Sequence, residues 1–326
     1  MNSCKEAPDP IFVFRGAKSP VMSVTFLKSP EDGLIHYLAA GTQEGQVLVW
    51  DLKTKCLFRD WIAYPDCSVL WIYSRQPGEI WTLGRHNSVK SWNISQPVPE
   101  TVKQYLLHDY LGFSHCDIYN GDDALLAIPG PSENSVTVFD IEKDSKVCIL
   151  TASMSPKKGN VMQIKWTCAY KKVLVIIMYE SGHISLWDYK TTSVVSEIQC
   201  RETPICLSVN TTSSVILVGS TAEKLFTFFI NDNLQIIADK EVEITNPGTS
   251  CCTARPDDKI FVTGGWDFRV RVYSSKKMKP LAVLFYHKKT VECLTYASDY
   301  VKEFDSRFLL AAGSSDKSIS LWKLFE

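Results

Sequence analysis

Histidine and cysteine side chains are the strongest candidates in this sequence for nucleophiles, proton carriers or metal ligands. Of the six histidines and eleven cysteines, only those in LLHDYLGFSHCD (106–117) lie together with an aspartate. His108 and His115 stand seven residues apart there, whereas metal-binding histidine pairs usually stand about three to five apart. The cysteines form no C-x-x-C pair. We therefore expect ordinary loop and strand polar groups in this segment, and no metal site.

Motifs for cofactors and activated nucleophiles are also missing. GSTAEK (219–224) shares only its composition with a phosphate-binding loop, because neither G-x-x-x-x-G-K-[ST] nor G-x-G-x-x-G occurs. The hydrolase motifs H-E-x-x-H and G-x-S-x-G do not occur either. We expect no catalytic residue and no cofactor, and therefore a protein that is not an enzyme.

The elements that position these side chains form a repeat. LAAGTQEGQVLVWDL (38–52) returns almost residue for residue as LAAGSSDKSISLWKL (310–324). Similar units lie between them, and each ends on an aromatic residue, at intervals of 41 to 49 residues. Such a period is typical of the four-stranded blades of a β-propeller. The aromatics predict an all-β, seven-bladed WD-repeat propeller: Trp50, Trp92, Phe139, Trp187, Phe228, Tyr273 and Trp322.

The two ends of the chain predict how the ring closes. Only four residues follow Trp322, too few for an outer strand, while IFVF (11–14) precedes the first complete blade. We expect residues 11–15 to pair as the outer strand of the seventh blade, since closure protects sheet edges. Residues 1–10 are then a flexible tail, and residues 11–326 a single propeller that forms a monomeric ring.

Composition restricts the partners and the compartment. The net charge is −1 and the isoelectric point about 6.6, so we expect neither a nucleic-acid nor a membrane partner. Residues 1–10 lack the apolar core of a signal peptide, and the odd number of scattered cysteines suits reduced thiols. We expect a protein of the cytoplasm and nucleus.

One turn stands out among the repeats. Trp266–Asp267 in FVTGGWDFRVRVY (261–273) precedes the third strand of its blade, and Asp267 aligns with Asp316 of the next blade. In WD repeats the aspartate at this position typically bonds to a histidine in the preceding loop. For Asp316 that histidine is His287. We expect a buried hydrogen-bonded set that contains His287, Asp316 and Trp322.

The same turn is the candidate partner site. Tryptophan is enriched at binding hot spots, although Trp266 packed against neighbouring loops is an equal alternative. The candidate residues are Trp266, Asn246, Pro247, Phe268 and Arg269. Arg269 and Arg271 alternate with valines, so we expect both to be solvated. Two segments that break the repeat, 127–135 and 297–307, are further candidates, because inserted loops often carry function.

Longer stretches resemble one family of proteins. The last third contains TNPG, RPDDKI, GGWDFRVRV and PLAVLFYH and ends on LLAAGSSDKSISLW, while DPIFVFRGAKSPV (9–21) and YESGHISLWD (179–188) lie earlier. Together they resemble guanine nucleotide-binding protein subunit beta-like protein 1, known in fungi as ASTRA-associated protein 1. The resemblance is specific at both ends of the chain, and in residues 95–165 it extends only to the blade pattern.

The resemblance implies a non-enzymatic scaffold. Its partners would be the TTT co-chaperone assembly, which matures and stabilises the phosphatidylinositol-kinase-related kinases, and the kinase clients. True G-protein β subunits carry a long N-terminal helix that coils with the γ subunit, whereas residues 1–10 show no heptads. We therefore expect no G-protein γ partner.

Two other functions stay open. A substrate receptor of a cullin-type ubiquitin ligase is one, because WDLK (50–53) and WDYK (187–190) loosely match the motif of such receptors. Both place lysine where arginine is preferred, and an ammonium does not replace a planar guanidinium. A reader of histone tails or other peptides is the second, and it would need an acidic or aromatic cage at the channel mouth.

Overall fold

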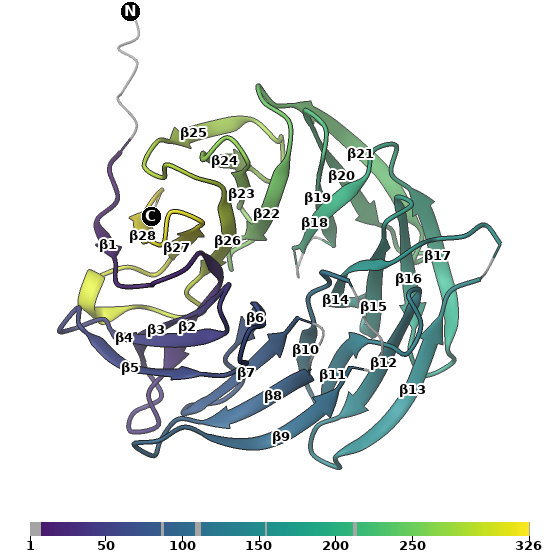
Figure 1. Cartoon of the computed structure of the whole chain (residues 1–326). Helices are drawn as coiled ribbons and strands as arrows, with labels where there is room; N and C mark the ends of the chain where they lie inside the picture. The colour runs from purple at the N-terminus through teal and green to yellow at the C-terminus, as the bar shows by residue number, and fades with distance from the viewer. Residues whose placement is uncertain (1–7, 86–87, 108–111, 154, 211–213, 326) are drawn as a thin grey trace, which may run out of the picture.

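The computed structural model describes residues 8–85, 88–107, 112–153, 155–210 and 214–325. They form seven antiparallel sheets of four strands, arranged as blades around a central channel (Figure 1). The predicted fold is therefore confirmed. Within the described residues the only helical element is a short 3₁₀ turn, Lys302–Phe304, and no helix there is long and apolar enough to span a membrane. Most of the predicted tail, residues 1–7, lies outside the described part of the chain.

Each blade runs from the channel outward in chain order, and the seventh takes its outer strand from the N-terminus. Blades one to three contain β2 (Val21–Lys28), β3 (Ile35–Thr42), β4 (Gln46–Asp51) and β5 (Leu57–Ile62); β6 (Val69–Tyr73), β7 (Glu79–Gly84), β8 (Ser88–Asn93) and β9 (Glu100–Leu106); β10 (Asp117–Asn120), β11 (Ala124–Pro129), β12 (Ser135–Asp140) and β13 (Ser145–Thr151). Blades four and five contain β14 (Val161–Ala169), β15 (Lys172–Tyr179), β16 (His183–Asp188) and β17 (Ser193–Gln199); β18 (Pro204–Val209), β19 (Val215–Ser220), β20 (Lys224–Ile230) and β21 (Ile236–Glu243). Blades six and seven contain β22 (Thr249–Ala254), β23 (Ile260–Gly265), β24 (Val270–Ser274) and β25 (Pro280–Leu284); β26 (Val291–Tyr296), β27 (Leu309–Ser314), β28 (Ile319–Lys323) and β1 (Phe12–Phe14).

Strand β1 closes the ring. It pairs antiparallel with β28, with Phe12 opposite Leu321 and Phe14 opposite Ile319. The Phe14 side chain is 2% exposed and its ring centroid lies 5.7 Å from that of Trp50. One apolar cluster therefore joins blade seven to blade one. The predicted pairing of residues 11–15 with the seventh blade is confirmed.

Glycines on the second strands set the spacing between blades. Gly41, Gly219, Gly264 and Gly313 occupy matching positions, opposite Ser23, Cys206, Cys251 and Cys293. A Cβ atom on Gly264 would lie 2.6 Å from the Cys251 sulfur and 2.7 Å from Cγ1 of Val291 in the next blade. Only glycine lets both neighbours approach this closely. This packing explains the small-residue signature before the turns of blades one, five, six and seven.

The insertion 297–307 lies between β26 and β27 and contacts blade one. Glu303 Oε1 lies 3.0 Å from His36 Nδ1, and Lys28 Nζ lies 2.6 Å from Asp299 Oδ2. The insertion thus bridges the same pair of blades that β1 joins. The other irregular segment, 127–135, consists of the end of β11, a compact turn and the first residue of β12, and the side chain of Ser135 bonds there to the backbone of Ser132.

Candidate functional site

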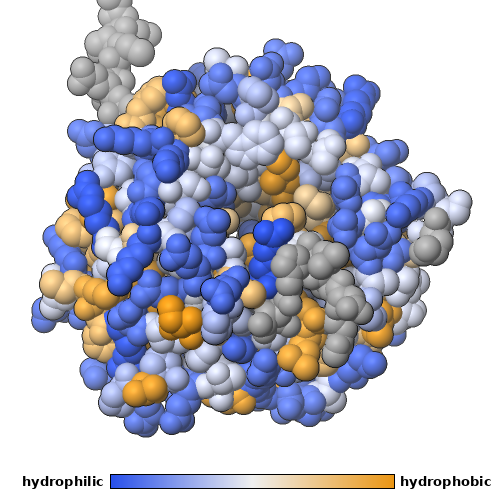
Figure 2. Space-filling view, viewed as in Figure 1, coloured by the Kyte–Doolittle hydropathy of each residue, from blue (hydrophilic) through white to orange (hydrophobic). Residues whose placement is uncertain are grey.

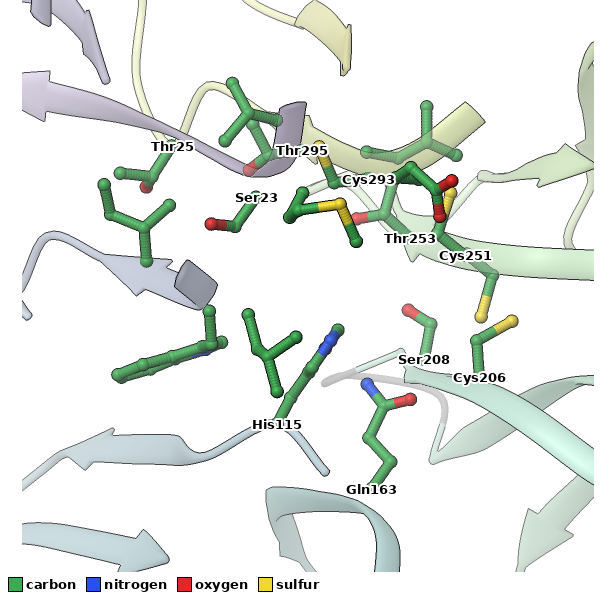
Figure 3. Close-up of a pocket in the computed structure, with 18 of the residues that line it drawn as sticks. Ser23, Thr25, His115, Gln163, Cys206, Ser208, Cys251, Thr253, Cys293 and Thr295 are labelled. Carbon is green, nitrogen blue, oxygen red and sulfur yellow. The ribbon is translucent and has the colours of Figure 1, made fainter. Parts of the chain in front are cut away.

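The central channel brings together side chains from the innermost strands. Its cavity of about 980 Å³ is lined by hydroxyl and thiol groups, among them Ser23, Thr25, Cys206, Ser208, Cys251, Thr253, Cys293 and Thr295 (Figure 3). Burial raises the pKa of Cys206 and Cys251 well above the usual range of a thiol. These thiols are therefore neutral near pH 7 and are poor nucleophiles. Within the described residues, no group of three or more His, Cys, Asp or Glu side chains could hold a metal ion.

The His–Asp–Cys segment reaches this channel but its groups do not converge. His115 points toward the channel interior (Figure 3), and burial, with the charge of Lys165, lowers its pKa to about 4. Asp117 accepts hydrogen bonds from Lys165 Nζ at 3.2 Å and from the backbone N–H of Trp166 at 2.8 Å. Its carboxylate is therefore committed to the neighbouring strand. His108 lies outside the described residues.

Trp266 lies at the edge of the channel on the upper face. This face is formed by the turns between second and third strands and by the connections between blades. The backbone N–H of Trp266 donates to the Gly248 carbonyl oxygen at 3.0 Å, and a Cβ on Gly248 would lie 2.0 Å from Cε3 of the indole. Gly248 also has φ +87°, which favours glycine. The ring of Trp266 therefore packs on this loop and is still 45% exposed. The predicted packing against neighbouring loops is present, and the role of Trp266 as a partner contact stays a prediction.

A buried ion pair supports the turn from beneath. Arg271 donates from Nη1 to Asp267 Oδ1 at 3.0 Å and from Nη2 to Oδ2 at 2.5 Å, and Asn246 Nδ2 donates to Oδ2 at 2.9 Å. Burial alone would raise the pKa of Asp267, but the hydrogen bonds from Arg271 and Asn246 outweigh it and lower the pKa. Asn246 is thus a positioning residue for the turn, whereas its neighbour Pro247 is exposed.

The prediction that Arg271 is solvated is wrong. Its side chain is 7% exposed, because both faces of β24 are covered, and it stands where blade seven has Ser320. Arg269 lies in the turn before β24, and the carbon of its guanidinium lies 4.7 Å from the ring centroid of Phe285. It is 39% exposed, in agreement with the expectation that it is solvated.

Phe268 has an unusual backbone conformation. Its φ is +72°, and its N–H donates to the Gly265 carbonyl oxygen at 3.2 Å. The same turn bond occurs at Gly45 and Gly182, whose φ values are +80° and +92°. A bulky residue in this conformation is rare and strained. Nothing in the sequence pattern revealed this conformation except the alignment of Phe268 with those glycines.

The structure brings His287, Asp316 and Trp322 together through a residue that sequence reasoning missed. His287 Nδ1 lies 3.0 Å from Asp316 Oδ2, and His287 Nε2 lies 2.8 Å from Ser320 Oγ. The indole N–H of Trp322 donates to the same Ser320 Oγ at 2.8 Å. Ser320 stands two residues before Trp322 on the same face of β28, and this spacing could have identified it. The chain of bonds pins the loop before blade seven to its third strand.

Comparisons with known proteins agree with this architecture. The family described as "WD domain, G-beta repeat" matches residues 244–274 and 278–323, which contain the turn of blade six and the set around His287. The mouse protein named guanine nucleotide-binding protein subunit beta-like protein 1 is 31% identical over 324 residues, covering 98% of this chain and 97% of that protein. The chain belongs to the guanine nucleotide-binding protein subunit beta-like protein 1 family.

Fungal members of this family carry a second name. ASTRA-associated protein 1 of Schizosaccharomyces pombe is 26% identical and that of Schizosaccharomyces japonicus 24%, each over 98% of this chain and 99% of the fungal protein. The resemblance predicted from the sequence motifs is confirmed. Membership of this guanine nucleotide-binding protein subunit beta-like protein 1 family and the WD repeats support a scaffold that acts through protein–protein contacts.

Proposed function

We infer that this chain is a non-enzymatic adaptor that works with the TTT co-chaperone assembly in the maturation and stability of phosphatidylinositol-kinase-related kinases, in the cytoplasm and the nucleus. The fungal relatives named ASTRA-associated protein 1 support an assembly role. One observation carries the site: the exposed turn Trp266–Phe268–Arg269 rests on the buried Asp267–Arg271 pair. A rigid support under exposed aromatic side chains lowers the entropy lost on binding.

The test uses purified components. Wild type and the double variant Trp266→Ala plus Asn246→Ala would be mixed with reconstituted TTT assembly, and the bound fraction measured by co-precipitation. We expect at least about a tenfold loss of affinity for the variant. Circular dichroism should show that the variant stays folded. The matched control is Phe58→Ala, which removes an exposed aromatic side chain from β5, the outer strand of blade one. This variant should bind TTT as wild type does.

Each other outcome has a definite meaning. If TTT binds wild type and the variant equally, the adaptor role stands and the site lies elsewhere, with 127–135 and 297–307 the next segments to alter. If TTT does not bind wild type at all, the proposed function is wrong. The cullin alternative would replace it if a cullin adaptor bound instead. However, Asp51 Oδ1 of WDLK accepts the backbone N–H groups of Lys53 and Thr54, each at 2.8 Å. That aspartate therefore has a local structural role in its own turn.

A further inference from the structure

We propose that the upper face of blades six and seven binds an acidic peptide segment that carries an apolar anchor residue. This proposal rests on the proposed adaptor function and names the chemistry of its partner. We call the surface the blade-six rim, and it consists of Trp266, Phe268, Arg269, Phe285, Lys288 and Lys317.

Three large aromatic side chains of the rim are exposed to solvent. Trp266 is 45% exposed, Phe268 42% and Phe285 59%. Phe268 and Arg269 follow Trp266 in one turn, and Arg269 stacks over Phe285 from the next loop. Adjacent exposed aromatics around an arginine have the composition of a binding hot spot.

The backbone conformation of Phe268 supports a functional role for its exposed side chain. The N–H of the third turn residue bonds to the residue before the turn in blades one, four, six and seven, at Gly45, Gly182, Phe268 and Lys317, all with positive φ. Glycine is the natural residue for such a position. Phe268 is strained there and still leaves 42% of its surface exposed, and strained positions persist where function requires them.

The exposed charges of the rim are positive, although the chain as a whole carries −1. Lys288 and Lys317 are exposed, and within the described residues neither Nζ forms an ion pair. The acids that adjoin the rim in blades six and seven are engaged internally. Asp267 is bound by Arg271 and Asn246 and lies 3.9 Å from Arg269 Nε, Asp316 is bound by His287 and Ser318, and Glu292 Oε1 accepts from Ser315 at 2.6 Å. An incoming carboxylate would therefore meet the ammonium groups of Lys288 and Lys317, which have no ion-pair partner among the described residues.

A recess with polar and apolar lining lies beside Trp266 of the rim. The channel cavity extends to Trp266, and Met162, Ile205 and Met22 line it as well. Figure 2 shows the ring hollowed at its centre, with apolar side chains at the edge of the hollow. Methionine and tryptophan together suit an aliphatic or aromatic anchor. Nucleic acid or a membrane would satisfy the cations alone, whereas an acidic peptide with an apolar residue satisfies the cations and the recess.

The experiment selects the ligand without bias. A phage-displayed library of random short peptides is panned on the full-length protein, and an enriched peptide is synthesised with a fluorophore for polarisation assays. We expect enriched peptides to combine several Asp or Glu with one Leu, Met, Phe or Trp. Affinity should fall at least about tenfold with Phe268→Gly, and by a similar factor with Lys288→Glu plus Lys317→Glu. Phe268→Gly should raise the melting temperature, because it relieves strain, so its loss of binding cannot be a loss of folding.

A charge-matched control lies on the lower face of blade six. Lys276 and Lys277 are exposed in the turn between β24 and β25, and the variant Lys276→Glu plus Lys277→Glu should bind the peptide as wild type does.

Enrichment of basic or neutral peptides, no enrichment, or equal binding by all variants would overturn the proposal. So would binding of a single-stranded RNA or of phosphatidylserine vesicles that depends on Lys288 and Lys317 but not on Phe268. Binding of purified TTT, measured in parallel, distinguishes this proposal from the proposed function. If TTT binds wild type and the rim variants equally, the blade-six rim is not the TTT site but the adaptor function stands. If acidic peptides are selected but TTT does not bind, the rim stands as a peptide site and TTT is not the partner.

Discussion

The guanidinium of Arg271 and the carboxylate of Asp267 form a two-pronged ion pair beneath the blade-six turn, with Nη···Oδ distances of 3.0 and 2.5 Å. Blade seven holds its turn aspartate in a different way, with the His287 ring between Asp316 and Ser320. In both blades a turn aspartate is held by a cation or a histidine from the interior. Blade six thus keeps its turn in place without a histidine in the preceding loop.

Removing the guanidinium should destabilise the ring. Arg271→Ala leaves Asp267 largely buried, with only the more distant Arg269 Nε at 3.9 Å as a cation, so we expect a loss of about 2–4 kcal/mol in the free energy of unfolding, measured by urea denaturation. Arg271→Lys should recover only part of this loss, because an ammonium cannot form the paired bonds. An Arg271→Lys variant as stable as wild type would contradict the importance of the two-pronged geometry.

The inter-blade glycines should tolerate no side chain. Gly264→Ala places a methyl group within 2.6 Å of the Cys251 sulfur and 2.7 Å of Val291, so we expect a destabilisation of about 1–3 kcal/mol from overpacking. The double variant Gly264→Ala plus Cys251→Ala removes one of the two clashing groups and should regain part of the loss. Thermal denaturation of the two variants beside wild type would show an unchanged midpoint for Gly264→Ala if the packing explanation is wrong.

Ring closure depends on β1. Deletion of residues 1–16 removes Phe14 from the cluster shared by blades one and seven, and loss of that buried side chain alone should cost about 1.5–3 kcal/mol. Deletion of residues 1–8 leaves β1 intact and should leave the melting temperature unchanged. The two truncations compared by calorimetry test the closure directly, and equal melting temperatures would count against it.

The contact between the 297–307 insertion and blade one should depend on pH. The hydrogen bond with Asp32 raises the pKa of His36, burial opposes this, and Glu303 raises it further. Because the folded pKa lies above the unfolded value, about 6.5, His36 stabilises the fold fully below that value. Its contribution is lost as the pH rises through the folded pKa.

The free energy of unfolding, followed by urea denaturation from about pH 6 to about pH 9, should therefore decrease more in wild type than in His36→Gln. His183→Gln is the matched control, because its ring nitrogen lies 2.8 Å from Ser181 Oγ rather than from a carboxylate. A His36→Gln profile parallel to that of wild type would show that the bridge does not depend on this charge.

The sequence predicted the ring well and the supports of its site poorly. The spacing of aromatic residues from Trp50 to Trp322 predicted seven blades, because each blade packs an aromatic residue at the same position. The Val–Arg alternation around Arg271 was misleading, since alternation indicates a solvated face only where a sheet has one open side. Neighbouring blades cover both faces of β24. Composition does not encode the strain at Phe268 or the bridging role of Ser320. The alignment of Phe268 with Gly45 and Gly182, and the spacing of Ser320 from Trp322, were the only signals of them.

The order in which the chain is synthesised has a consequence for closure of the ring. Strand β1 is made first, but its partner β28 lies at the other end of the chain. Six blades can assemble while the ribosome is still translating, yet the last gap cannot be sealed until the final residues emerge. A nascent chain therefore carries an open sheet edge, with Phe12–Phe14 unpaired, until β28 has emerged. Any premature stop that removes β28 leaves that edge permanently open.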